Sequence, residues 1–145
     1  MSRRPKASQE RRDAPVFEVC VHGQPVSAQT RRRPALQAWK NRIRNACEAA
    51  WERAPIDGNV IICVTHYYET AIGDVDNLIK PIQDALQGVV YVNDKQVRDV
   101  TGKRRPIAGR FKVRYISMPL AAAFSNGRQF VHIQVWHSPK REELG

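Results

Sequence analysis

Three aspartates, Asp74, Asp76 and Asp94, are the residues of this chain best suited to hold a metal ion. Asp74 and Asp76 lie two residues apart in an extended segment, so their side chains start on the same face. Asp94 follows a segment with the pattern of a short helix and then a short predicted strand, at whose end it lies. Carboxylates from two or three such positions form the all-oxygen site that magnesium prefers while it keeps several of its waters. An ion bound there would lower the pKa of a bound water and offset charge on a phosphate that is being cut.

A lysine and a further acid are in register with this cluster. Asp76, Lys80 and Asp84 recur every four residues, which places them along one side of a helix. From one turn into that helix, Lys80 would reach the same phosphate and stabilise its charge. A structural interpretation also exists for each residue: Asp76 as a helix cap, Asp74 in a turn, and Lys80 with Asp84 as a surface ion pair contributing about 0.3 to 0.5 kcal/mol. Their joint occurrence favours a site.

Basic residues outnumber acidic ones in the chain, 24 Lys and Arg against 14 Asp and Glu, for a net charge of +10. This balance attracts polyanions. Nucleic acid is the expected partner, because the longest helical pattern does not have the bulky apolar anchors of a membrane-surface helix. Basic residues in two segments would neutralise backbone phosphates. We expect these contacts from Arg31, Arg32, Arg33, Lys40, Arg44, Lys103, Arg104 and Arg105.

The elements that must position these residues follow from the spacing of apolar side chains. Alternating or β-branched stretches predict strands, and apolar residues recurring at three and four positions predict helices. The second predicted helix has Asp76 or Asn77 as its cap and Gly88 just past its end. Strands are predicted over residues 16–21, 59–68, 89–92, 97–104 and 129–137, and helices over residues 36–50 and 78–87.

These elements predict one α+β (mixed α/β) domain over residues 15–138, with a mixed sheet and two main helices in the order β-α-β-α-β-β-β. Residues 1–14 are expected to form a disordered basic tail and residues 139–145 a polar tail. Residues 106–127 fit neither period clearly and are expected to form an inserted arm.

The cysteines and the absence of long apolar runs indicate the cellular compartment in which the protein is expected. Cys20, Cys47 and Cys63 are an odd, widely spaced set, which predicts reduced, buried thiols in place of disulfides or a zinc site. No apolar run reaches the length of a bilayer, and the charged start of the chain is unlike a signal peptide. A cytoplasmic protein is expected.

The segment around the aspartates resembles a known family. The run Asp-x-Asp-Asn-x-x-Lys-x-x-x-Asp-Ala-Leu, with a later acid followed by x-Gln-Val, is similar to the signature of the RusA family of Holliday junction resolvases, found in bacteria and their phages. The looser similarity extends over residues 17–103. The matching positions are Asp74, Asp76, Asn77, Lys80, Asp84, Ala85, Leu86, Asp94, Gln96 and Val97.

The resemblance implies a homodimeric crossover junction endodeoxyribonuclease that uses magnesium, with manganese as a substitute. Such an enzyme nicks four-way DNA in symmetric pairs during recombination and repair. The resemblance makes Asp74, Asp76 and Asp94 the catalytic, metal-binding carboxylates and Lys80 the catalytic lysine. Asn77 and Asp84 are expected to support them, Asp84 by holding Lys80 or by meeting the metal through water.

Some features depart from the family pattern or leave alternatives open. Asn93 stands where many relatives have a second acid, so the number of metal ions stays open. A non-catalytic, basic nucleic-acid-binding module would carry the same charge without metal-dependent cleavage. A metal nuclease for flaps or other branched DNA would carry the same motif, since junction selectivity arises from the shape of the dimer.

Overall fold

A four-stranded mixed sheet forms the centre of a computed structural model that describes residues 13–70, 75–108 and 116–139. The strand order is β1-β4-β2-β3. β4 pairs antiparallel with both of its neighbours, whereas β2 and β3 are parallel. The strands are β1 (Phe17–His22), β2 (Val60–Tyr68), β3 (Val97–Pro106) and β4 (Phe130–His137).

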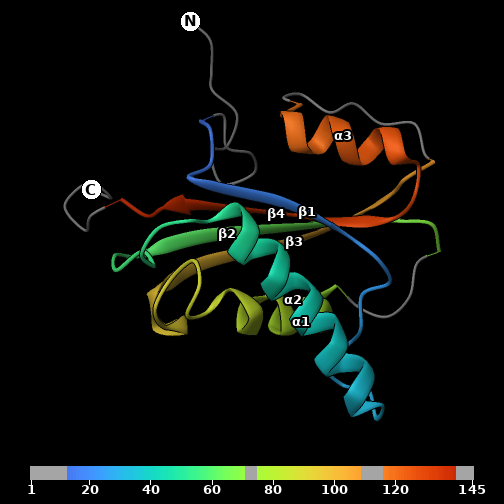
Figure 1. Ribbon diagram of the computed structural model, residues 1–145, viewed down its shortest axis with the longest axis horizontal. Helices are drawn as coiled ribbons and strands as arrows, with labels where there is room; N and C mark the ends of the chain where they lie inside the picture. Colours follow the sequence, from blue (N-terminus) through green and yellow to red (C-terminus); the bar gives the residue numbers. More distant parts are fainter. Residues whose placement is uncertain (1–12, 71–74, 109–115, 140–145) are drawn as a thin grey trace, which may run out of the picture.

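Helices lie on both faces of the sheet (Figure 1). On one face lie α1 (Arg33–Ala50) and α2 (Asp76–Leu86), and α3 (Met118–Asn126) lies on the other. A short 3-10 helix, η2 (Asp94–Gln96), leads from the α2 region into β3. Because β2 and β3 are parallel, the chain must cross over between them, and α2 with η2 makes this crossover.

The main core lies between the sheet and the pair α1 and α2. The buried side chains of β4 that face this core are Val131, Ile133 and Val135, and those of the two helices include Ile43 and Leu86. α2 lies close to β3: a Cβ on Gly102 would stand 2.8 Å from the Cδ1 atom of Ile79. The absence of a side chain at that glycine therefore lets the helix that carries the site approach the sheet.

A smaller core lies under α3. Leu120 and Ala123 of this helix pack on Tyr67 and Phe130 of the sheet. Ser117 caps the helix by accepting a hydrogen bond from the backbone N–H of Leu120.

The prediction of a mixed α+β domain is confirmed, and two details of the predicted order are wrong. Residues 89–92 are not a strand, because the chain turns after the end of α2 and the backbone N–H groups of Val89 and Val90 bond to the carbonyl of Leu86. α3 lies within residues 106–127, so the chain carries a third helix and the described order is β-α-β-α-β-α-β. The Gly127 backbone ends this helix in the left-handed region, with φ of 77°.

The cysteine prediction is confirmed at two of the three positions. Cys47 and Cys63 are buried free thiols, and Cys20 is a free thiol that is partly buried. Burial raises the pKa of Cys47 to about 12. None of the helices in the described ranges is long and apolar enough to span a membrane. The expected tail residues 1–12 and 140–145 lie outside the described part of the chain.

Candidate active site

Lys80, on the exposed side of α2, lies between two carboxylates. Its Nζ atom is 3.0 Å from Oδ1 of Asp84, one turn further along the helix, and 3.5 Å from Oδ2 of Asp94 at the start of η2. The hydrogen bond and negative charge of Asp84 raise the pKa of Lys80, with a smaller contribution from Asp94. The ammonium group therefore stays charged, and with 61% of its side chain exposed it is open to an anion.

α1 extends this ion pair into an alternating row of charges. The Nζ atom of Lys40 is 3.4 Å from Oδ2 of Asp84, so this aspartate is held between two lysines. Arg44 donates to the backbone carbonyls of Asp84 and Gln87, at 3.4 and 3.2 Å. These carbonyls lie at the C-terminal end of α2, where a cation is favourable. α1 thus supports both the side chain of Asp84 and the helix that carries it.

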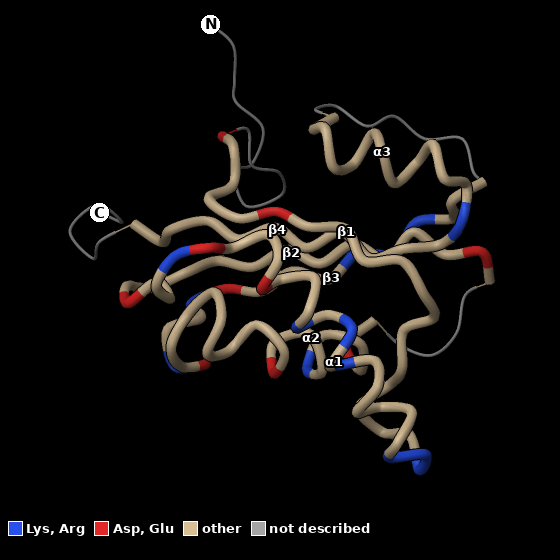
Figure 2. Tube along the Cα trace, viewed as in Figure 1, with Lys and Arg blue, Asp and Glu red and all other residues tan. Residues whose placement is uncertain are grey.

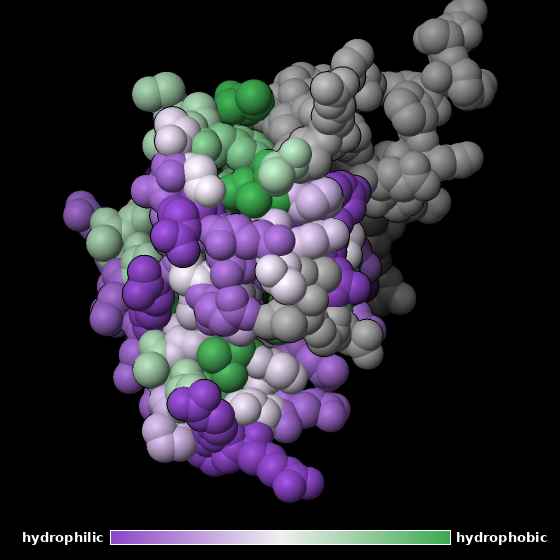
Figure 3. Space-filling view, turned by 90° about the vertical axis from the view of Figure 1, so that its right-hand side faces the viewer, coloured by the Kyte–Doolittle hydropathy of each residue, from purple (hydrophilic) through white to green (hydrophobic). Residues whose placement is uncertain are grey.

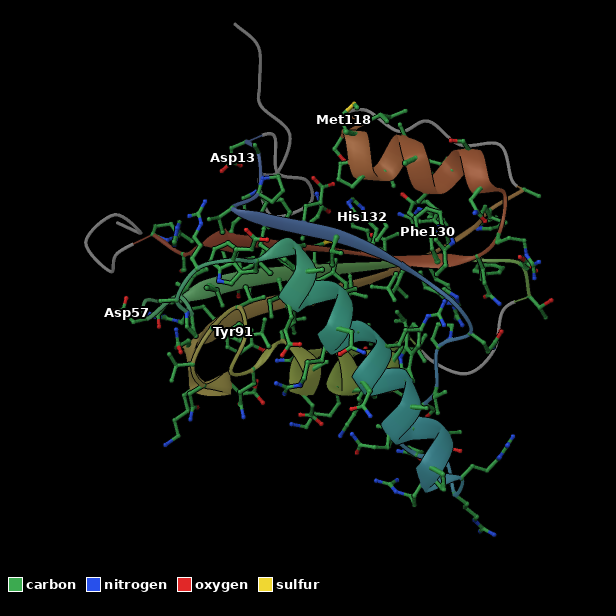
Figure 4. The ribbon with its side chains drawn as sticks, in the orientation of Figure 1. Asp13, Asp57, Tyr91, Met118, Phe130 and His132 are labelled. Carbon is green, nitrogen blue, oxygen red and sulfur yellow. The ribbon has the colours of Figure 1, made fainter. Side chains whose placement is uncertain are left out.

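The carboxylate of Asp94 is oriented by residues that precede it. The hydroxyl of Tyr91, a fully buried residue, donates to Oδ1 of Asp94 at 3.0 Å. Burial and the charge of Asp94 raise the pKa of Tyr91, so its hydroxyl remains a donor. The backbone N–H of Asp94 donates to Oε1 of Gln87 at 2.9 Å. Figure 4 shows Tyr91 on the α2 side of the sheet. One carboxylate oxygen of Asp94 therefore faces Tyr91 and the other faces Lys80.

Asp76 is the first residue of α2 and does not cap it. The N-cap position is Val75, and no side-chain cap hydrogen bond is formed, so the expectation that Asp76 or Asn77 caps the helix is wrong. Asp76 is exposed one turn before Lys80, and at the N-terminal end of the helix its negative charge interacts favourably with the helix dipole. The carbonyl of Asn77 accepts from the N–H of Ala28 at 2.9 Å, which ties the start of α2 to the segment before α1.

The donor chemistry of the described aspartates fits a hard divalent cation. Asp76 and Asp94 present carboxylate oxygens, the ligand type of magnesium, from the start of α2 and the start of η2. Within residues 13–70, 75–108 and 116–139, no group of three His, Cys, Asp or Glu side chains could hold a metal ion. Asp74, the third ligand expected from the sequence, lies outside these residues.

The basic residues expected to bind DNA fall into three groups. Arg31, Arg32 and Arg33 are exposed at the start of α1, where Figure 2 shows a basic end. Lys40 and Arg44 contact α2, as described above. The β3 group has partly buried Lys103 and Arg104 and exposed Arg105.

Some residues of the site were not predicted from the sequence. Lys40 was assigned only to DNA, because its ion pair depends on how α1 crosses α2. Tyr91 and Gln87 were not singled out at all. The signal for Tyr91 was its position within a short apolar run just before the last aspartate of the motif.

Comparison with known proteins agrees with the motif. The family model described as endodeoxyribonuclease RusA matches residues 15–115. The chain belongs to the RusA family. It is therefore an endodeoxyribonuclease of the class that acts at Holliday junctions. The match includes α2 and η2, whereas α3 and β4 lie beyond it. No curated protein matches the chain.

Proposed function

We propose that this RusA-family enzyme resolves Holliday junctions by magnesium-dependent hydrolysis of two symmetrically placed strands, in DNA recombination and repair. The observation that carries the proposal is the charged amine of Lys80, held between Asp84 and Asp94 on the exposed side of α2.

Asp74, Asp76 and Asp94 would hold the metal, with manganese able to replace magnesium. When bound, the ion would supply a Lewis acid and a water of lowered pKa. Asp94 is suited to this role because the hydrogen bond from Tyr91 restrains one oxygen while the other stays on the side of Lys80.

Lys80 would bind a non-bridging oxygen of the scissile phosphate and stabilise the charge that develops on it. Asp84 holds this amine in place, and Lys40 holds Asp84. An approaching phosphate would compete with Asp94 for Lys80, whereas the shorter contact with Asp84 keeps the amine on α2. Asn77 supports the site by fixing the start of the helix.

The DNA arms would be bound through their phosphates. Arg31, Arg32, Arg33 and Arg105 are exposed for such contacts, with Lys103 and Arg104 beside them on β3. Lys40 and Arg44 would add to the positive field from their places next to α2. Because one domain carries one copy of the motif, paired nicks require a second copy of the chain, related by the two-fold axis that a four-way junction also has.

The substrate is tested by incubating the purified protein with labelled four-way, flap and linear DNA of one sequence, with and without magnesium. We expect magnesium-dependent cuts at symmetric positions in the four-way substrate and little cutting of the other two. Equal cutting of all three would remove junction resolution and leave a general nuclease.

The dimer is tested by sedimentation at micromolar protein together with a plasmid that extrudes a cruciform. A dimer that cuts both strands within one bound complex gives linear plasmid directly. A monomer that yields only nicked circles would contradict paired cleavage while leaving the metal chemistry intact.

A further inference from the structure

The side chain of Gln96 ties the turn that presents Asp94 to the segment of Ile56 and Gly58. Its Oε1 atom accepts hydrogen bonds from the backbone N–H groups of Val92 and Asn93, at 2.9 and 2.8 Å. Its Nε2 atom donates to the backbone carbonyls of Ile56 and Gly58, at 2.7 and 2.6 Å. A primary amide has two donor hydrogens and two acceptor lone pairs, so every hydrogen-bonding position of Gln96 is used.

These four bonds join the turn to a segment anchored in the main core. Ile56 is buried, and its N–H donates to the carbonyl of Val90 at 2.8 Å. On the other side, the side chain of Asn93 accepts from the N–H of Lys95 and begins η2. Asp94 therefore stands in a turn that Gln96 closes, because the Gln96 side chain bonds both to the two residues before Asp94 and to the segment of Ile56 and Gly58.

We propose that Gln96 is a positioning residue that fixes the direction of the Asp94 carboxylate toward the metal site and Lys80. The inference rests on the proposed function. It also gives a physical reason for the glutamine of the signature. Glutamate has no hydrogens to donate to the two carbonyls, and asparagine is one methylene shorter than the side chain that spans the turn here.

Two variants and one control test the role. Gln96→Glu keeps the length and both acceptor bonds but loses the two donated bonds, and Gln96→Ala loses all four. Ile133→Val removes one methylene from the main core, away from the turn, and lowers stability without touching Asp94. Each protein is compared at a temperature where it is folded.

The measurements separate positioning from general destabilisation. Hydrogen exchange without metal measures how well the backbone amides of Val92 and Asn93 are protected. The shift in the midpoint of thermal unfolding on adding magnesium or manganese measures metal binding. The rate of single-turnover cleavage measures the chemical step. Metal-free junction affinity, measured by gel shift, reports on DNA binding.

We expect faster hydrogen exchange at these two amides in both Gln96 variants. We also expect either that about 10 to 100 times more metal is needed for half-maximal cleavage, or that the cleavage rate falls by about 10- to 100-fold. Junction affinity without metal should stay within about twofold, since Gln96 carries no charge and its amide is fully used by bonds to the protein backbone. Gln96→Glu is the informative variant if Gln96→Ala does not fold.

Cleavage and metal response equal to those of Ile133→Val would overturn the positioning role. Failure of the proposed function looks different: an Asp94→Asn variant would then cut as fast as the unsubstituted protein, whatever the Gln96 variants do.

Discussion

The two faces of the sheet each carry paired acids and bases, but the pairs differ in their access to solvent. On the α2 face, the side chains of Lys80, Asp84 and Asp94 are 61%, 32% and 31% exposed. On the α3 face, the side chains of His132 and Glu18 are only 6% and 14% exposed. Figure 4 shows His132 between the sheet and α3.

The pair on the α3 face joins three elements. The Nε2 atom of His132, on β4, lies 2.6 Å from Oε2 of Glu18, on β1, and the hydroxyl of Ser117 donates to the same oxygen. Because Ser117 caps α3, this contact attaches the helix to the sheet. Figure 3 shows apolar surface at its top. Ile116, just before α3, and Met118, at the start of α3, are exposed.

The difference in solvent exposure distinguishes a candidate active site on the α2 face from a structural ion pair on the α3 face. An exposed row of charges can exchange one partner for a metal ion or a phosphate at little cost. A buried pair cannot, because removing one partner leaves a desolvated charge. We therefore propose that the chemistry takes place on the α2 face and that Glu18 and His132 contribute to stability.

Removal of metal is the change with the largest expected effect on the α2 face. Chelation should reduce single-turnover cleavage of a four-way junction by more than about a thousandfold, roughly 4 kcal/mol of barrier. Junction binding in a gel shift should survive. Magnesium should restore cleavage and raise the midpoint of thermal unfolding, because the proposed metal site would exist only in the folded protein. Full activity in the presence of chelator would contradict a metal role for the α2 face.

Lys80→Ala should slow the chemical step by about 100- to 1000-fold. Its effect on affinity should be small, because many other cations contribute to binding and this one is directed at the reacting group. Single-turnover rates and gel shifts measure the two quantities separately. Arg53→Ala is a matched control, since this exposed arginine stacks on Trp51 and is not among the residues proposed to bind DNA or metal. Equal losses in rate and affinity would make Lys80 an ordinary phosphate contact.

Glu18→Gln should affect stability and leave cleavage unchanged. Burial alone would raise the pKa of Glu18, but hydrogen bonds from His132 and Ser117 and the charge of His132 hold it below its ordinary value. The stabilisation by Glu18 is therefore present above the pKa of an unfolded glutamate and is lost as the pH falls through the lowered pKa. We expect the variant to lose about 2 kcal/mol near neutral pH.

Urea unfolding between pH 7 and pH 3 measures this difference, which should shrink toward the acid end. Cleavage per folded molecule should match the unsubstituted protein. A loss of cleavage without a loss of stability would indicate that Glu18 takes part in the reaction, and the two faces would then not differ in function.

Much of the fold could be predicted from the sequence because, in most elements, the spacing of the apolar residues matches the side of the strand or helix that is buried. The alternating residues of β1 and the β-branched run of β2 show their pattern locally. α3 was missed because it is short and Ala-rich, and its buried side depends on Leu120 and Ala123 meeting the sheet. Val89, Val90 and Tyr91 are buried as a strand would be, yet the N–H groups of Val89 and Val90 bond to the carbonyl of Leu86 at the end of α2. Periodicity does not distinguish these two ways of burying a short apolar segment.

The site was predictable only where it lies within one element. The four-residue spacing of Asp76, Lys80 and Asp84 defines one side of α2. The ion pair from Lys40 crosses between two helices, and the hydrogen bond from Tyr91 depends on the geometry of a turn. Neither contact leaves a periodic signal in the sequence.

The most direct test of the account compares two isosteric substitutions, Asp94→Asn on the α2 face and Asp99→Asn at an exposed position of β3. Both remove one negative charge, and only the first removes a proposed metal ligand beside Lys80. Single-turnover cleavage of a four-way junction in magnesium, with gel-shift affinity measured in parallel, should show no cleavage by Asp94→Asn with binding intact or tighter. Asp99→Asn should cut normally. Cleavage by Asp94→Asn within about tenfold of the unsubstituted rate, roughly 1.4 kcal/mol of barrier, would contradict the assignment.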